Sequence, residues 1–64
     1  MNAFQAMQKA TREQIDRVIN SPEFLRLSVI AGKANSPFAT ATDRVLASEA
    51  NRQITDMWIA EVAQ

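Results

Sequence analysis

The side chains of this sequence that could do chemistry are carboxylates, amines, guanidinium groups and hydroxyls, because histidine, cysteine and tyrosine are absent. Imidazole bases, thiol nucleophiles and phenolic acids are therefore excluded, and so are the usual ligands of structural zinc. The single glycine, Gly32, precedes Lys33, but a phosphate-binding loop also needs a glycine further upstream. We therefore predict no catalytic residue, no metal or cofactor site and no small-molecule substrate, and we do not expect an enzyme.

Seven basic and seven acidic residues leave the chain without net charge. Several residues of opposite sign stand three or four positions apart, where they would be neighbours on a solvated helix face. These pairs are Lys9–Glu13, Arg12–Asp16, Glu13–Arg17, Glu49–Arg52 and Arg52–Asp56. The sequence has no basic run of the kind that attracts nucleic acids in general, and no stretch has the length and purity of a membrane span. Nucleic-acid and membrane partners are therefore disfavoured.

The elements that must position these side chains are marked by two Ser-Pro pairs on either side of the only glycine. Serine accepts hydrogen bonds from the first N–H groups of a helix, and proline fits the first helical position. Ser21-Pro22 and Ser36-Pro37 therefore predict two helix starts, and Gly32 predicts a helix end in a left-handed turn. With Asn2 as a cap, we expect one helical domain over residues 1–64, with helices over about 3–19, 22–31 and 37–63.

The first two segments carry apolar residues at helical spacing. In the first segment they form one predicted stripe, made of Phe4, Met7, Thr11, Ile15 and Val18. The second segment is apolar around most of its circumference, so we expect a short helix that is buried on most sides. Its alternation of Leu25, Leu27 and Val29 also fits a strand, but no other segment offers a pairing partner.

The third segment has no helix breaker from Pro37 to Gln64, or from Thr40 if that hydroxyl forms a capping box with Asp43. A helix over 37–63 would be about 40 Å long, whereas a compact domain of this size is about 28 Å across. Part of its apolar stripe should then stay uncovered in a monomer. Small domains also commonly rely on a disulfide, a metal or a second copy, and the first two are excluded here. A helical homo-oligomer is therefore predicted.

The apolar side of this long helix holds the candidate interface, because tryptophan and methionine are typical of contact surfaces. The small side chains of Ala47 and Ala50 would let a second helix approach closely. The predicted interface residues are Leu46, Ala50, Ile54, Met57, Trp58 and Val62, with Phe4 and Met7 as opposing groups. In the alternative interpretation, Trp58 closes a monomeric core against Phe4 and Phe24.

A second functional interpretation comes from residues 29–32 and 39–46, which read VIAG and ATATDRVL. They resemble the two helices of lactose-repressor-type headpieces, in which an Ala-Gly turn leads to a recognition helix, and the match covers about a quarter of the chain. The resemblance implies DNA binding, with Lys33, Arg44 and Arg52 as the contacting cations. The connection is about two residues longer than in that family and contains Pro37, and Asp43 would face the phosphates.

The sequence thus predicts an all-α protein with three helices, of which the C-terminal one is long. We expect a non-enzymatic protein–protein interaction module, such as a small regulatory, inhibitor or adaptor protein, that binds itself or a larger protein. The alternatives are a helix-turn-helix-like DNA-binding protein and a small structural subunit of a larger assembly. A cytoplasmic location is expected because the first residues do not resemble a secretory signal. Small neutral helical chains are common among bacterial and phage accessory proteins, which is an association and not a physical argument.

Overall fold

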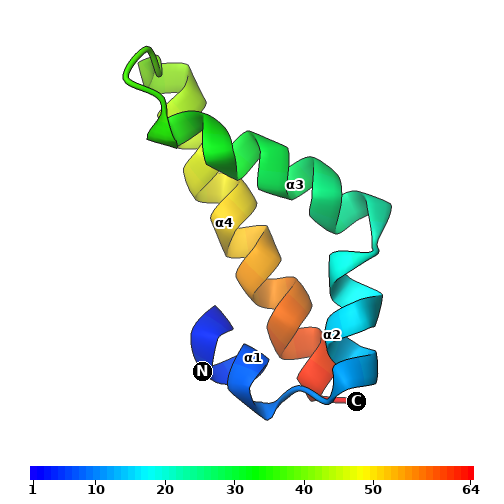
Figure 1. Cartoon of the computed structure of the whole chain (residues 1–64). Coiled ribbons are helices and arrows are strands. Elements are labelled where there is room, and N and C mark those ends of the chain that lie inside the picture. Colours follow the sequence, from blue (N-terminus) through cyan, green and yellow to red (C-terminus); the bar gives the residue numbers. More distant parts are fainter.

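The computed structural model describes all 64 residues and shows four α-helices, one short 3-10 turn and no strand. The elements are α1 (Ala3–Lys9), α2 (Arg12–Ile19), α3 (Pro22–Gly32), the 3-10 turn η1 (Lys33–Asn35) and α4 (Ala41–Val62) (Figure 1). The predicted all-α class is confirmed, although the helices number four and not three. None of them combines the length and the apolar character that crossing a bilayer requires.

The predicted continuous helix over 3–19 is wrong, because the chain breaks at Ala10 and Thr11. Both residues are extended, with ψ angles of 141° and 166°. The Thr11 hydroxyl accepts a hydrogen bond from the Gln14 N–H at 3.2 Å, and the Gln14 side chain accepts one from the Thr11 N–H at 2.8 Å. This reciprocal capping box starts a new helix, so α1 and α2 can approach α4 from different directions. The sequence contained this signal, Thr followed three residues later by Gln, and the prediction overlooked it.

The predicted helix over 22–31 is confirmed as α3, and its start is the expected one. The Ser21 hydroxyl accepts a hydrogen bond from the Phe24 N–H, and Pro22 occupies the first turn. The predicted left-handed end at Gly32 is wrong: its φ and ψ are −68° and −22°, and no residue of the chain has a positive φ. The chain continues through Gly32 into η1 with ordinary helical dihedrals.

The long C-terminal helix begins at Ala41 with Thr40 as its N-cap, as in the second of the two predicted starts. Thr40 and Asp43 form a capping box, in which each side chain accepts the backbone N–H of the other at 3.1 Å. Ser36-Pro37 is not a helix start, since the Ser36 hydroxyl accepts the Phe38 N–H within a turn. α4 therefore has 22 residues and is about 33 Å long, shorter than predicted but unbroken.

The four helices form an elongated molecule in which α4 is the common support (Figure 1). α3 returns along the N-terminal part of α4, while α1 and α2 lie at its C-terminal end, where both chain termini are also found. The principal extents are 37 × 22 × 14 Å, and the radius of gyration is 12.5 Å. A compact domain of 64 residues would have a radius of gyration of about 10.7 Å. The half of the molecule that contains the α3–α4 connection is thus a simple two-helix hairpin.

The hydrophobic core lies at the other end and centres on Trp58. Ala6 of α1, Val18 of α2 and Trp58 of α4 are its buried members. The Trp58 ring meets Phe24 of α3 edge to face, with the ring centroids 6.2 Å apart and an interplanar angle of 83°, an arrangement that aromatic pairs favour. All four helices therefore contribute to this one cluster.

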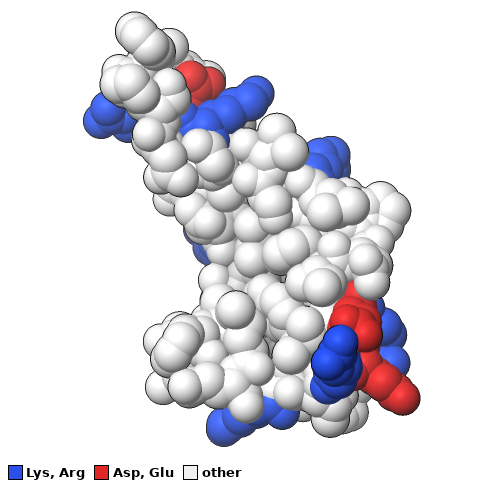
Figure 2. All heavy atoms as spheres, viewed as in Figure 1, with Lys and Arg blue, Asp and Glu red and all other residues white.

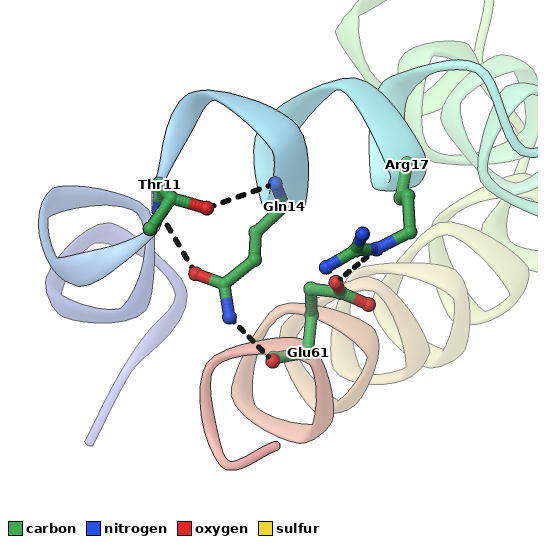
Figure 3. Close-up of polar contacts among 4 residues, drawn as sticks. All are labelled: Thr11, Gln14, Arg17 and Glu61. Atoms are coloured by element: carbon green, nitrogen blue, oxygen red, sulfur yellow. Dashed lines mark hydrogen bonds and ion pairs between the residues drawn. The ribbon is translucent and has the colours of Figure 1, made fainter.

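Polar contacts fasten α2 to the end of α4 (Figure 3). The Gln14 side chain, besides capping α2, donates to the Glu61 carbonyl oxygen at 3.0 Å, and the Arg17 guanidinium donates to the Glu61 carboxylate at 2.7 Å. The latter is the only ion pair of the chain. None of the predicted pairs within one helix forms, and the break at Thr11 places Lys9 and Glu13 on different helices.

Candidate functional site

None of the polar or charged residues is buried. No three acidic residues stand close enough together to hold a metal ion, and no polar side-chain atom is buried without a hydrogen-bond partner. One open hollow of about 340 Å³ lies over α1 and is lined by Met1, Gln5, Gln8 and Lys9. All four of these lining residues are exposed. The candidate site must be sought on the apolar surface.

The predicted interface on α4 is largely occupied by the fold itself. Trp58 is 4% exposed and Ala50 is 2% exposed, so neither presents a surface to a second chain. The prediction that these two residues lie on an exposed contact surface is wrong. Ala47 and Ala50 are buried where α3 lies on α4, so these small side chains admit the chain's own helix.

The other predicted interface residues differ in accessibility. Ile54, Met57 and Val62 are half-buried, and Ile54 and Val62 pack against the Trp58 cluster. Leu46 remains exposed on the first turns of α4. Phe4 and Met7 are exposed on α1, which faces α4 through its alanines instead. The only aromatic ring that pairs with Trp58 is therefore that of Phe24. The alternative interpretation placed Trp58 against both Phe4 and Phe24, and only the contact with Phe24 forms.

The predicted DNA-contacting cations Lys33, Arg44 and Arg52 are all exposed. The acidic side chain of Asp43 lies near Lys33, however. The pKa of the Asp43 carboxyl is lowered, first by the Thr40 N–H, then by the Thr40 side chain, and also by the positive charge of Lys33. Since Lys33 lies near enough to act on Asp43, this end of the molecule carries both signs of charge (Figure 2).

Sequence reasoning named three of the most accessible apolar residues, Phe4, Met7 and Leu46, and missed the others. Nine large apolar side chains are at least 40% exposed, compared with six buried residues in the whole chain. The exposed set comprises Met1, Phe4, Met7, Ile19, Leu25, Val29, Phe38, Val45 and Leu46. The expectation that α3 is buried on most sides is wrong, because only Leu27 of that helix is buried. α3 lies on the outside of the molecule, with α4 covering one of its faces.

The exposed part of α3 has an ordered arrangement. Leu25 and Val29 are 54% and 66% exposed, and they stand one helical turn apart. Gly32 follows three residues later and is also exposed, so the three residues lie along one side of the helix. We call Leu25, Val29 and Gly32 the outer α3 stripe. The sequence contained a signal for this stripe, because Leu25 and Val29 are apolar residues four positions apart. They form a row separate from Phe24, Leu27 and Ala31, which lie on the side of the helix that faces α4.

The distribution of charge supports an uncharged candidate surface. In the view of Figure 2, lysine, arginine, aspartate and glutamate side chains lie at the two ends and along the edges. The middle of this face, over α3 and the adjoining part of α4, carries none. A broad uncharged face rimmed by charges is the arrangement expected of a contact surface.

Comparison with protein-family models, with curated proteins and with solved structures finds no match to this chain.

Proposed function

We propose that this protein is a non-enzymatic protein–protein interaction module that acts as a homodimer. Such a module suits a small regulatory, inhibitor or adaptor protein. One observation supports the proposal above all: the chain leaves more large apolar side chains exposed than it buries residues of any kind. Scattered apolar residues are normal on a surface, so the support comes from their number in so small a chain, which we take as the sign of a surface that another protein covers.

The accessible surface area agrees with this proposal. The chain exposes 4628 Å², whereas a compact folded monomer of the same mass exposes about 4,100 Å². If a second copy covered the surplus of about 500 Å² on each chain, the interface would bury about 1,000 Å² in total, the lower limit for specific association. The zero net charge leaves no overall repulsion between two copies. We therefore expect a reversible dimer with a dissociation constant in the micromolar range.

The test is the mass of the protein in solution over a concentration series. Sedimentation equilibrium from about 1 µM to 1 mM should show a weight-average mass that rises from one chain toward two. The melting temperature should rise with concentration in the same samples, because association stabilises the folded state by mass action. A single-chain mass across this range, with a melting temperature independent of concentration, would refute the proposal.

A further inference from the structure

We infer that the dimer forms by exchange of α1, so that α1 of each copy covers Trp58 of the other. This inference rests on the proposed self-association and specifies the segment that makes it. The site that receives α1 is already built into the chain, since Ala6 of α1 is 0% exposed and belongs to the same buried cluster as Trp58. A second copy offers an identical site, and exchange of one element between two copies is a low-cost route to a dimer.

Small apolar side chains alone attach α1 to the rest of the fold. Three alanines pack against the core, namely Ala3, Ala6 and the C-cap Ala10. No hydrogen bond or ion pair joins α1 to another helix, whereas α2 is fastened to Glu61 of α4 by both kinds of contact. A helix of seven residues is also too short to persist by itself in water. α1 is therefore the helix that leaves the core at the lowest cost.

The break between α1 and α2 can become helical. Residues 3–19 contain neither proline nor glycine, and only two extended residues interrupt the helix. The capping box at the break satisfies the N–H groups of Thr11 and Gln14. Those of Arg12 and Glu13 have no acceptor in the chain. A continuous helix would pair all four with carbonyl oxygens at the end of α1, so straightening supplies the two acceptors that the break lacks.

Straightening would carry α1 away from its own α4. α2 begins at the lower end of the molecule in Figure 1, beside the end of α4, so a helix continued backward from Thr11 leaves the molecule. On such a helix the spacing places the three alanines on the same side as Gln14 and Arg17, which contact α4. The alanines then face the side of α4 but lie beyond its last residue, Val62. A second copy is what can present Trp58 to them there.

Exchange restores what straightening removes. A single chain that opens in this way uncovers the Trp58 indole, which is 4% exposed when α1 lies on its own α4. Two open chains cover each other's indole with the same alanines and keep the helical bonds gained at the break. The remaining cost is the lost independent motion of two chains, so the population of the exchanged dimer rises with concentration.

Arg12→Pro distinguishes the two forms. In the structure, Arg12 is exposed and occupies the first position of α2 after an extended residue, where proline is well accommodated. In a straight helix the same proline would remove an interior hydrogen bond and clash with the preceding turn. Sedimentation equilibrium should therefore show a dissociation constant raised at least a hundredfold, while the melting temperature of the dilute monomer stays the same or rises.

Arg12→Ala is the matched control, because it removes the same guanidinium group but permits both forms. It should leave the dissociation constant within threefold of the wild type. Thr11→Ala should act in the opposite direction to Arg12→Pro, since it removes the cap of α2 and introduces a better helix former at the break. Its dissociation constant should fall at least tenfold, although the dilute monomer melts earlier.

The exchanged contact can be observed directly in a dimer mixed from isotope-labelled and unlabelled chains. An isotope-filtered nuclear Overhauser spectrum should connect the Ala6 methyl group of one chain with the Trp58 indole of the other. In a dimer of two closed chains, this cross-peak would arise within one chain and be absent from the filtered spectrum.

The outcomes separate this inference from the proposed function. A dimer that persists in Arg12→Pro with a dissociation constant within threefold of the wild type would overturn the exchange and leave self-association intact. A wild-type dimer without the Ala6–Trp58 cross-peak between chains would do the same. A wild-type protein that stays monomeric over the whole concentration series would overturn the proposed function, and the exchange with it.

Discussion

Replacement of Trp58 by alanine should unfold this protein instead of merely weakening its association. The indole is 4% exposed and lies among Ala6, Val18 and Phe24. A buried tryptophan removes about 150–250 Å² from water, which at about 25 cal/mol per Å² corresponds to roughly 4–6 kcal/mol. Measured aromatic-to-alanine substitutions in cores cost about 3–5 kcal/mol, and the edge-to-face contact with Phe24 is included in that loss. We take about 4 kcal/mol as the expected change.

The total stability of the chain sets the consequence. At about 0.05–0.15 kcal/mol per residue, 64 residues provide roughly 3–10 kcal/mol in all. Trp58→Ala should therefore leave the protein largely unfolded at 25 °C, or lower its melting temperature by at least about 20 °C. Far-UV circular dichroism at 222 nm during heating measures both results. Because Trp58 is the only tryptophan, its fluorescence emission reports its transfer to water in the wild type at the same transition.

Phe38→Ala is the matched control, since it also removes a large aromatic side chain but from a position that is 89% exposed. Its melting temperature in dilute solution should stay within about 3 °C of the wild type, because exposed substitutions change stability by about 0.5 kcal/mol or less. If Trp58→Ala melted like the wild type, or if Phe38→Ala melted as early as Trp58→Ala, the assignment of the core to Trp58 would be refuted.

Three other predictions concern the caps and the α3–α4 contact. Asp43→Asn should abolish one contribution to the pH dependence of folding stability. Because the pKa of the Asp43 carboxyl is lowered in the folded protein, its ionised form stabilises the fold above about pH 4. That stabilisation is lost as the pH falls through the folded-state pKa. Acid titration followed by circular dichroism should show the loss in the wild type and not in the variant. Gln14→Ala should lower the free energy of unfolding by about 1–2 kcal/mol in urea denaturation, because it removes the bond to the Glu61 carbonyl and half of the capping box. The exposed Gln8→Ala should not, and equal effects would contradict the contact. Ala47→Leu should cost about 2–3 kcal/mol by overpacking the buried α3–α4 contact. A urea midpoint unchanged from the wild type would show that α3 does not approach α4 closely there.

Much of the secondary structure could be read from the sequence, because its determinants are local. The starts of α3 and α4 each depend on a side chain that caps a backbone N–H three residues away, and such pairs are visible as spacings. The break at Thr11 has the same origin and could have been found by the same reasoning. It was overlooked because the apolar spacing from Phe4 to Val18 ran across it.

For the candidate surface, the sequence predicted an uncovered apolar surface but not all of the residues that form it. The predicted length of the C-terminal helix indicated that part of its apolar stripe would stay uncovered, but not which residues. Trp58 and Leu25 are both large apolar residues on helices, yet one is enclosed and the other is exposed. The difference depends on which helix lies beside each, and for Trp58 this includes Ala6, which is remote in the sequence.

By itself, then, the sequence determined the helical class, the caps, the absence of histidine, cysteine and tyrosine, and the neutral charge, since these depend on residue types and on contacts within one helical turn. The tertiary structure decided what those helices enclose. It turned α1 back onto α4, closed Trp58 beneath three other helices and left one side of α3 facing water. These outcomes depend on packing between segments that are far apart in the chain. The break at Ala10 and Thr11, for example, changes the direction of the chain and so changes which residues of α1 and α2 face α4.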